Sequence, residues 1–470
     1  MTTTFLHGVE VLQVDTGARP IQTVRSSVIG LIGTAPDADA DKFPINQPVL
    51  LARRSEMQGL GEAGTLFKAL DLIYDQAGAV VIVIRVDEGA NEGATINNVV
   101  GGINETTGAY EGVQGFLAAE NAVGFAPRVL LAPEFTHQRA SNGILSIAVA
   151  TQGAGYLTAP AVTVSGGGGS GAVVRAILGT GDNAGKVVEF IIDNPGSGYT
   201  SSPTITIAAP PEGGSQAVAG TVNRGSVRNE VLSELLGIAQ RLRAVIIADG
   251  PNTTDAAAIQ IADDFGSDRI YVVDPWIIRN GEAFPASPAV AGLINKVDNE
   301  RGFWWSPSNN EISGIEGTAR AIDFALGDYT SRANLLNEQK IATIVREQGF
   351  RLWGNRTLAM DPKYAFLSVR RTADMINESI LRGHLWAVDR CITATYLEEV
   401  QESVRSYLRN LKARGAILGG DVWVDPELNS PENIANGQVF FDFEFTPPYP
   451  AERVTFRSHL VNSYVVDLFR

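Results

Sequence analysis

The sequence predicts a multi-domain α/β protein: a mostly parallel sheet core, an α+β C-terminal domain, a small all-β inserted domain and extended terminal arms. Its 470 residues are about three times a typical domain of roughly 150 residues, so several cores are expected. Short apolar runs alternate with helical stretches along most of the chain, and one internal segment has a different composition. With 44% hydrophobic and 19% charged residues, the chain has enough apolar material to bury large cores.

The core domain is predicted from short, mostly apolar runs that suit strands covered by helices on both faces. The predicted strands span residues 28–32, 49–52, 80–86, 129–131, 245–248 and 270–273. In one complete unit, a strand ending at Ala248 is followed by a turn, Thr253 or Thr254 can cap a helix, and the next strand begins at Ile270. These runs place the α/β core domain in two pieces, residues 26–140 and 226–345.

The segment between these pieces, residues 141–225, holds 17 glycines and only seven charged residues. Within it, the stretch from Gly153 to Val164 recurs from Gly196 to Ile207, at an offset of 43 residues. Both copies contain alternating strand patterns and no helical periodicity. The repeat therefore predicts a small inserted all-β domain.

A separate α+β domain is predicted over residues 346–450. Residues 372–389 and 395–414 have the periodicity of two helices. The second helix has an apolar stripe that is most simply core: Leu397, Val400, Val404, Leu408 and Leu411. Residues 439–445 alternate phenylalanines with carboxylates, which is typical of a half-solvated antiparallel strand.

Both ends of the chain have the pattern of strands without local partners, giving an N-terminal arm over residues 1–25 and a C-terminal arm over 451–470. The prolines of the segment 446–450 hold the chain extended before the second arm. An unpaired strand invites aggregation unless pairing with a neighbour is its purpose. We therefore expect contacts between subunits at Val9, Val11, Val14, Val454, Phe456, Tyr464, Val465 and Val466.

The net charge of −15 disfavours binding to nucleic-acid phosphate or to anionic lipid. Residues 340–470 are neutral, so the whole acidic excess lies in residues 1–339 and the C-terminal part should face a different partner. The apolar run 79–84 is too short to span a bilayer, and the first residues lack a secretory signal pattern. We expect synthesis and assembly in a cytoplasm, without direct membrane insertion.

The segment Gly59–Gly64 matches the glycine pattern of a dinucleotide-binding loop, but residues 53–58 separate it from the preceding strand. Dinucleotide binding by such a loop needs the first glycine directly after the strand. We therefore interpret Gly59–Gly64 as a plain connection between helices. The glycines of 166–171 lack the lysine of a P-loop, and Asp15-Thr-Gly17 has no second copy that could form an aspartic-protease dyad.

Other catalytic or metal-binding groups are scarce. The chain has one cysteine and four histidines, and we find no Ser-His-Asp arrangement. Cys391, beside Ile392, is interpreted as a small core residue. We expect no cofactor, no metal and no enzyme activity.

At this point the sequence resembles the tail sheath proteins of contractile-tailed bacteriophages, the family that includes R-type pyocin sheaths. The resemblance is dispersed over most of the chain outside 141–225. It rests on residues 7–11, 19–35, 71–86, 244–255, 298–309, 349–356, 366–378 and 441–452.

The resemblance implies six-subunit rings stacked around a tail tube, joined by terminal arms that complete β-sheets in neighbouring subunits. It implies contraction that drives the tube through the host envelope, with a baseplate and a tail terminator as further partners and the virion tail as the location. It also implies that the C-terminal domain faces the tube and the insert faces outward. We expect tube contact at Arg405, Arg409 and Lys412 on the charged face of the second helix.

Two other classes stay open from the residues alone. A nicotinamide-dependent oxidoreductase would use Gly59–Gly64, and a hydrolase would need a site that we do not find. A β-rich adhesin would use the repeats of the insert.

Overall fold

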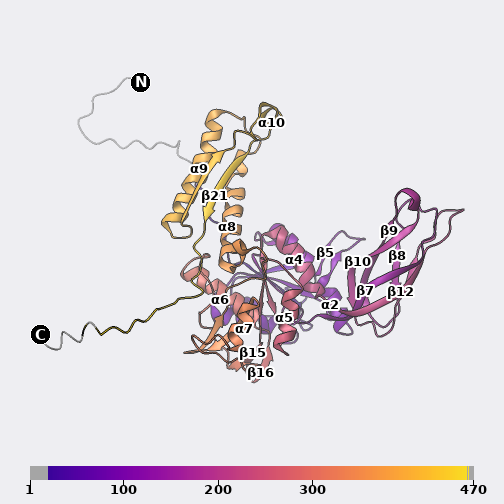
Figure 1. The fold of residues 1–470 in the computed structure, drawn as a ribbon, viewed down its shortest axis with the longest axis horizontal. Helices are drawn as coiled ribbons and strands as arrows, with labels where there is room; N and C mark the ends of the chain where they lie inside the picture. The colour runs from indigo at the N-terminus through magenta and orange to yellow at the C-terminus, as the bar shows by residue number, and fades with distance from the viewer. Residues whose placement is uncertain (1–19, 463, 465–470) are drawn as a thin grey trace.

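The computed structural model describes residues 20–462 and residue 464. A central α/β body carries the C-terminal domain on one side and a projecting β unit on another, while the C-terminal segment leaves the body as an extended chain (Figure 1).

Within the described residues, the body is built on one eight-stranded sheet in the order β19-β18-β14-β13-β6-β1-β3-β2. The strands from β18 to β3 run parallel, so the predicted mixed α/β fold with a large, mostly parallel sheet is confirmed. Their bounds are β1 (Ile29–Thr34), β2 (Pro48–Leu51), β3 (Val81–Val86), β6 (Val129–Leu131), β13 (Val245–Asp249), β14 (Ile270–Val273), β18 (Ile341–Arg346) and β19 (Phe350–Trp353).

The two edges of this sheet depart from the parallel pattern. β2 runs antiparallel to β3, and β19 runs antiparallel to β18. The predicted runs at 49–52 and 80–86 are both strands. Their apolar pattern does not tell whether the two strands run parallel or antiparallel, because an edge strand pairs on one side only. β2 is mostly half-buried, whereas every residue of β3 is buried.

Alternate residues of each strand point to opposite faces of the sheet, so the body has two cores. Val245 and Ile247 of β13 enter one core, and Ile246 and Ala248 enter the other. This explains the uninterrupted apolar runs in the sequence. One face is covered by α1 (Leu66–Gln76) and α6 (Ser287–Glu300). The opposite face is covered by α2 (Glu92–Val100), α3 (Gly115–Val123), α4 (Glu230–Leu242), α5 (Asp255–Asp263) and α7 (Arg332–Glu338).

A local sequence signal explains where α5 begins. Thr254, one of the two predicted caps, accepts a hydrogen bond from Ala257 N at the start of α5. Shorter elements complete the body: η1 (Arg54–Met57), β4 (Gly102–Ile103), β5 (Tyr110–Glu111), η2 (Gly112–Gln114), β15 (Ile277–Arg279), β16 (Glu282–Phe284), β17 (Gly317–Thr318) and η4 (Pro362–Tyr364).

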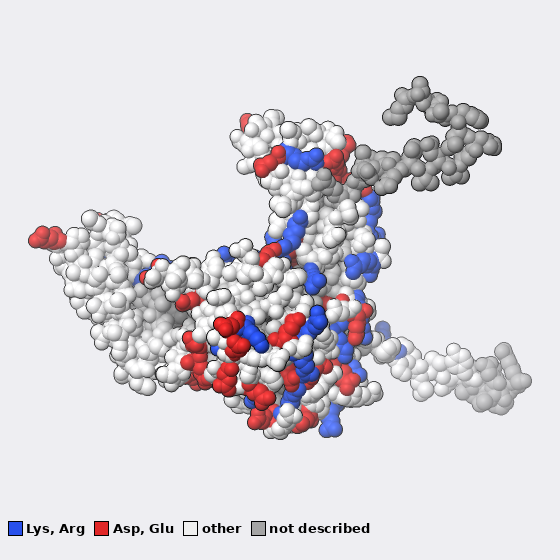
Figure 2. Space-filling model, turned by 180° about the vertical axis from the view of Figure 1, so that it is seen from behind, with Lys and Arg blue, Asp and Glu red and all other residues white. Residues whose placement is uncertain are grey.

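The projecting β unit has a core of its own. It consists of β7 (Ala140–Thr151), β8 (Val162–Ser165), β9 (Ser170–Leu178), η3 (Gly181–Asn183), β10 (Val187–Ser197), β11 (Thr204–Ile207) and β12 (Val218–Val227). β8 and β11, the matching strands of the two repeats, pair antiparallel with Thr163 opposite Thr206. Tyr156 and Tyr199 are both buried in the shared core, which explains why each repeat has a tyrosine there. On the face shown in Figure 2, charged side chains gather over the body and few lie on this unit.

The C-terminal domain consists of α8 (Leu367–Gly383), η5 (Leu385–Ala387), α9 (Ala394–Ala413), β20 (Gly419–Val424), α10 (Pro431–Ala435) and β21 (Phe441–Thr446). In the predicted apolar stripe of α9, Val400, Val404, Leu408 and Leu411 are buried and Leu397 is half-buried. Phe443 and Phe445 of β21 pack against this core.

Candidate assembly interface

The hairpin of the C-terminal domain has open edges. β20 and β21 pair antiparallel over six residues each, from Gly419 opposite Thr446 to Val424 opposite Phe441. Among the described residues these two strands form a sheet by themselves, so each has one edge without a ladder partner. Trp423 on β20 is 41% exposed. On β20, Val422 O already accepts hydrogen bonds from the side chains of Gln401 and Arg405, so the second edge of β21 is the better surface for adding a further strand.

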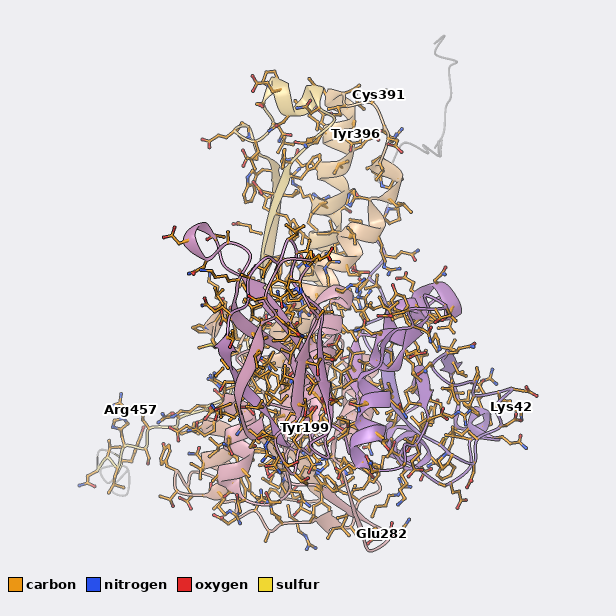
Figure 3. The ribbon with its side chains drawn as sticks, turned by 90° about the vertical axis from the view of Figure 1, so that its right-hand side faces the viewer. Lys42, Tyr199, Glu282, Cys391, Tyr396 and Arg457 are labelled. Carbon is orange, nitrogen blue, oxygen red and sulfur yellow. The ribbon has the colours of Figure 1, made fainter. Side chains whose placement is uncertain are left out.

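The C-terminal segment beyond this hairpin is extended and exposed. Val454 is 67% exposed, Phe456 is 90% exposed and Tyr464 is 74% exposed. Arg457 lies on this segment, away from the body (Figure 3). Val454 and Phe456 belong to no strand within the subunit, so their pairing with another copy stays a prediction. The other predicted arm residues, Val9, Val11, Val14, Val465 and Val466, lie outside the described residues.

The cations that were predicted to contact a tube are largely occupied within the subunit. Arg405 lies 3.3 Å from Asp421 and 3.5 Å from Glu402, and Arg409 also pairs with Glu402. The hydrogen bond from Arg409 lowers the pKa of Glu402. Lys412 is exposed and has no ion pair among the described residues. The sequence signal was the spacing of Glu402, Arg405 and Arg409, at three and seven residues from Glu402, which places these side chains on one helix face.

A chain of ion pairs along α8 joins the C-terminal domain to the body, and the sequence analysis missed it. Glu378 accepts hydrogen bonds from Arg128 at 2.7 Å, Arg243 at 2.7 Å and Arg382 at 2.6 Å. The side chains of Glu378 and Arg128 are 6% and 5% exposed. Burial opposes ionisation of Glu378, but these three guanidinium groups outweigh it and hold its pKa at about 2.

The same helix has further buried pairs one and two turns earlier. Asp374 accepts hydrogen bonds from Arg269 and Arg370, at 2.8 Å each. Arg371 pairs with Asp298 of α6, and both side chains are less than 5% exposed. The four-residue spacing of 370, 374, 378 and 382 was a visible signal, because such residues share one face of a helix. α8 is thus fixed by charge to the amino ends of the central strands.

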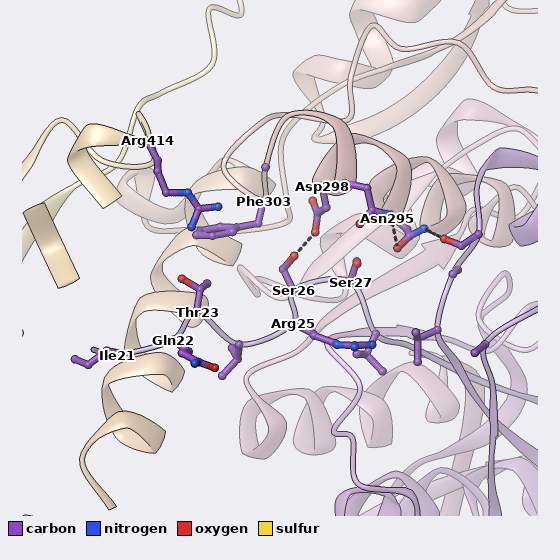
Figure 4. Close-up of a pocket in the computed structure, with 18 of the residues that line it drawn as sticks. Ile21, Gln22, Thr23, Arg25, Ser26, Ser27, Asn295, Asp298, Phe303 and Arg414 are labelled. Carbon is purple, nitrogen blue, oxygen red and sulfur yellow. Dashed lines mark hydrogen bonds between the residues drawn. The ribbon is translucent and has the colours of Figure 1, made fainter. Parts of the chain in front are cut away.

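A groove of about 690 Å³ lies where the C-terminal domain meets the body. The extended segment 21–28 forms one wall, and Ser26 of this segment donates a 2.6 Å hydrogen bond to Asp298 (Figure 4). Arg25 lies over the Phe125 ring and Arg414 over the Trp304 ring, and neither has an ion pair among the described residues. The groove therefore offers two uncompensated positive charges.

Comparison with known proteins identifies the family. Three family models match: "Tail sheath protein Gp18 domain III N-terminal region" over residues 26–86, "Phage tail sheath protein central domain" over 217–358, and "Phage tail sheath C-terminal domain" over 359–460. A prophage major tail sheath protein of Pseudomonas aeruginosa is 35% identical, over 99% of this chain and 98% of its own length. This chain belongs to the phage tail sheath family.

Other sheath proteins agree in sequence and in fold. The tail sheath protein of Burkholderia phage BcepMu is 32% identical over 100% of this chain and 99% of its own length. The contracted helical sheath of the anti-feeding prophage has a TM-score of 0.59 at 14% identity, covering 97% of this chain and 99% of its own. The contracted sheath complex of an extracellular contractile injection system, PVC, has a TM-score of 0.58 at 14% identity, covering 98% and 99%. The protein is thus a tail sheath protein, as predicted, and its fold is that of the sheath subunits in these two assemblies.

The glycine-rich loop of this sheath subunit is a packing feature. Gly59–Gly64 follows η1 and precedes α1, as the preferred reading expected, and does not directly follow a strand. Gly64 has φ +82°, and a Cβ there would lie 2.4 Å from the carbonyl oxygen of Thr34. The glycine is required because the loop backbone lies directly against the end of β1.

Gly64→Ala should lower the free energy of unfolding by roughly 2 kcal/mol or more, because it combines a left-handed backbone with a backbone clash. Chemical denaturation measures this change. Gly237→Ala, at an exposed helix position with open space around it, is the matched control and should not destabilise the subunit. Unchanged stability of Gly64→Ala, together with calorimetric binding of a dinucleotide, would contradict the packing role.

Cys391 is exposed, so its interpretation as a core residue was wrong: it lies in the loop between η5 and α9. In the part of the chain that the structure describes, no group of three or more His, Cys, Asp or Glu side chains could hold a metal ion. No helix there is long and apolar enough to cross a membrane.

Proposed function

We propose that this sheath subunit polymerises as stacked six-membered rings around a tail tube and contracts to drive that tube through a host cell envelope. The observation that carries the proposal is an open-edged hairpin, β20–β21, in a chain that also has an exposed, unpaired C-terminal segment. The sequence relatives are named as tail sheath proteins, and two of the similar solved assemblies are contracted sheaths.

The arms, residues 1–25 and 451–470, would join the rings by adding strands to hairpins of neighbouring subunits. Main-chain hydrogen bonds hold such strands together regardless of side-chain identity, so the link can persist while subunit bodies rotate. Contraction would then be a rigid-body rearrangement towards better subunit packing. No nucleotide is needed to supply the free energy in this scheme.

The C-terminal domain, residues 346–450, would face the tube. Residues 340–470 carry no net charge, whereas the acidic excess lies in residues 1–339, and this difference supports a separate environment for the C-terminal domain. The insert, residues 141–225, would face outward as a decoration or a weak surface-binding module. Its projection from the body and its few charges are compatible with that position.

Further partners would be a baseplate and a tail terminator at the two ends of the sheath. A baseplate of the anti-feeding prophage contains a chain of the same fold, with a TM-score of 0.58 at 14% identity. We place the protein in the virion tail, after assembly in the cytoplasm of the host bacterium.

Tube contact is proposed on α9, and Lys412 should contribute most to it because Arg405 and Arg409 are already paired. Lys412→Glu should weaken co-assembly with purified tube protein, and the wild-type contact should weaken as salt rises from 50 mM to 500 mM. Sedimentation of sheath with tube measures both effects. Lys42→Glu, a charge reversal at an exposed position on the body, is the control. Equal sedimentation of Lys412→Glu and wild type at every salt concentration would contradict this contact.

A further inference from the structure

The C-terminal arm is fastened to the body just before it becomes free. The guanidinium of Arg356 makes two hydrogen bonds to the Glu452 carboxylate, Nε to Oε1 at 2.7 Å and Nη2 to Oε2 at 2.6 Å. The same guanidinium lies over the Phe366 ring at 5.1 Å, and Tyr449 meets that ring edge-on at 6.1 Å. The pairing with Glu452 raises the pKa of Arg356. Four side chains thus hold the root of the arm.

The side-chain contacts between the C-terminal arm and the body end at Glu452 and Arg453. Arg453 donates a 3.2 Å hydrogen bond to the Tyr329 hydroxyl. From Val454 to Val461, the described residues form no hydrogen bond or ion pair within the chain, and Leu460 is 97% exposed. Glu452 is therefore the last strongly held residue of the C-terminal arm.

The loop that holds Glu452 is crossed by main-chain hydrogen bonds. Arg356 lies in the loop between β19 and α8, and hydrogen bonds across this loop join Thr357 N to Ala365 O at 2.8 Å and Leu367 N to Asn355 O at 3.0 Å. α8 begins at Leu367, directly after Phe366. The arm is thus fastened to the start of the helix whose ion pairs hold it to the central sheet.

We propose that the Arg356–Glu452 pair is a clamp that fixes where the C-terminal arm leaves the subunit and transmits the pull of a neighbouring subunit into α8. Without the clamp, a pull on the arm would act first on Thr446 and the β21 strand of the hairpin. With the clamp, the pull reaches Phe366, α8 and the buried ion pairs at Asp374 and Glu378. This inference rests on the proposed strand exchange, but the anchoring itself can be measured on the single subunit.

Trypsin cleavage after Arg453 and after Arg457 measures the anchoring, because both sites lie in the native chain and only the first is next to the clamp. Cleavage after Arg457 should be the faster of the two in the wild type. Arg356→Met keeps apolar contact with Phe366 but removes both hydrogen bonds, and it should raise cleavage after Arg453 about fivefold. Cleavage after Arg457 should stay unchanged. Mass spectrometry of the released peptides gives both rates.

Two variants control this experiment. Arg356→Lys keeps the positive charge without the two-pronged geometry, so it should show most of the increase. Arg346→Met removes an exposed arginine on the neighbouring strand β18 and should leave both cleavage rates at their wild-type values. If Arg356→Met does not change the rate after Arg453, the clamp is overturned.

Electron microscopy of the same variants tests the mechanical role. Arg356→Met should give fewer and shorter tubes than the wild type and Arg346→Met. Normal tubes that contract normally, formed by a variant whose Arg453 site is released, would overturn the transmission of pull. If the wild type itself forms no tubes, the proposed function fails while the cleavage result still decides the anchoring.

Discussion

Deleting residues 454–470 should leave a folded subunit that no longer forms tubes. The described residues beyond Arg453 make no hydrogen bond or ion pair within the chain, and Phe456 is 90% exposed, so their loss should change the free energy of unfolding by less than about 0.5 kcal/mol. Tube formation should be lost, because the strand that would pair with a neighbour's hairpin is missing. Chemical denaturation and electron microscopy measure the two effects.

A full-length variant separates strand pairing from chain length. The double variant Val454→Pro with Phe456→Pro keeps the chain length but removes two main-chain hydrogen-bond donors. Like the deletion, it should not assemble. Arg457→Ala keeps the main chain intact and should assemble normally. We expect the deletion of residues 1–14 to abolish assembly as well. Normal tubes from the 454–470 deletion would show that this arm does not join subunits.

Replacing Glu378 should be the most destabilising single change in the C-terminal domain. Glu378→Gln keeps the shape of the side chain but leaves the guanidinium of Arg128, 5% exposed, without its charge partner. Breaking a buried ion pair in this way costs about 3–5 kcal/mol. Thermal and chemical unfolding measure the loss. Glu398→Gln, on the exposed face of α9, should change stability by less than about 0.5 kcal/mol.

The double variant Arg128→Met with Glu378→Gln tests whether the two groups act together. It should be less destabilised than the sum of the single variants, because it removes the unpaired charge that each single change leaves behind. Additive losses would show that the pair is not coupled.

Glu378 also sets a direction for the pH dependence of stability. Its pKa of about 2 in the folded subunit lies below the value of about 4.3 in an unfolded chain. Its stabilisation is therefore present above pH ~4.3 and is lost as the pH falls towards 2. Glu378→Gln should show a smaller loss of stability over this range than the wild type.

The central sheet was predictable because its strands are buried on both faces, which leaves short apolar runs such as 129–131 and 270–273 in the sequence. The direction of the edge strand β2 relative to β3 was not predictable. A strand that pairs on one side only can run either parallel or antiparallel to its neighbour. The repeat in the insert was visible as sequence, whereas the pairing of Thr163 with Thr206 depends on how the two copies fold back on each other.

The interface was predictable only in part. Val454 and Phe456 are exposed, as an arm that pairs with a neighbouring subunit requires, but their strand pairing stays a prediction. The ion pairs of Arg405 and Arg409 with Glu402 were not predicted, although all three residues belong to the charged face of the predicted helix. The clamp at Glu452 joins positions 96 residues apart, and the ion pair of Arg128 with Glu378 joins positions 250 apart, so only the fold reveals them.

Negative-stain electron microscopy of the purified, full-length subunit tests the central claim most directly. The account predicts long hollow cylinders with a regular helical repeat, because each subunit has both an exposed arm and an open-edged hairpin. A protein that stays monomeric at high concentration, under conditions where its unfolding transition shows it to be folded, would contradict the account.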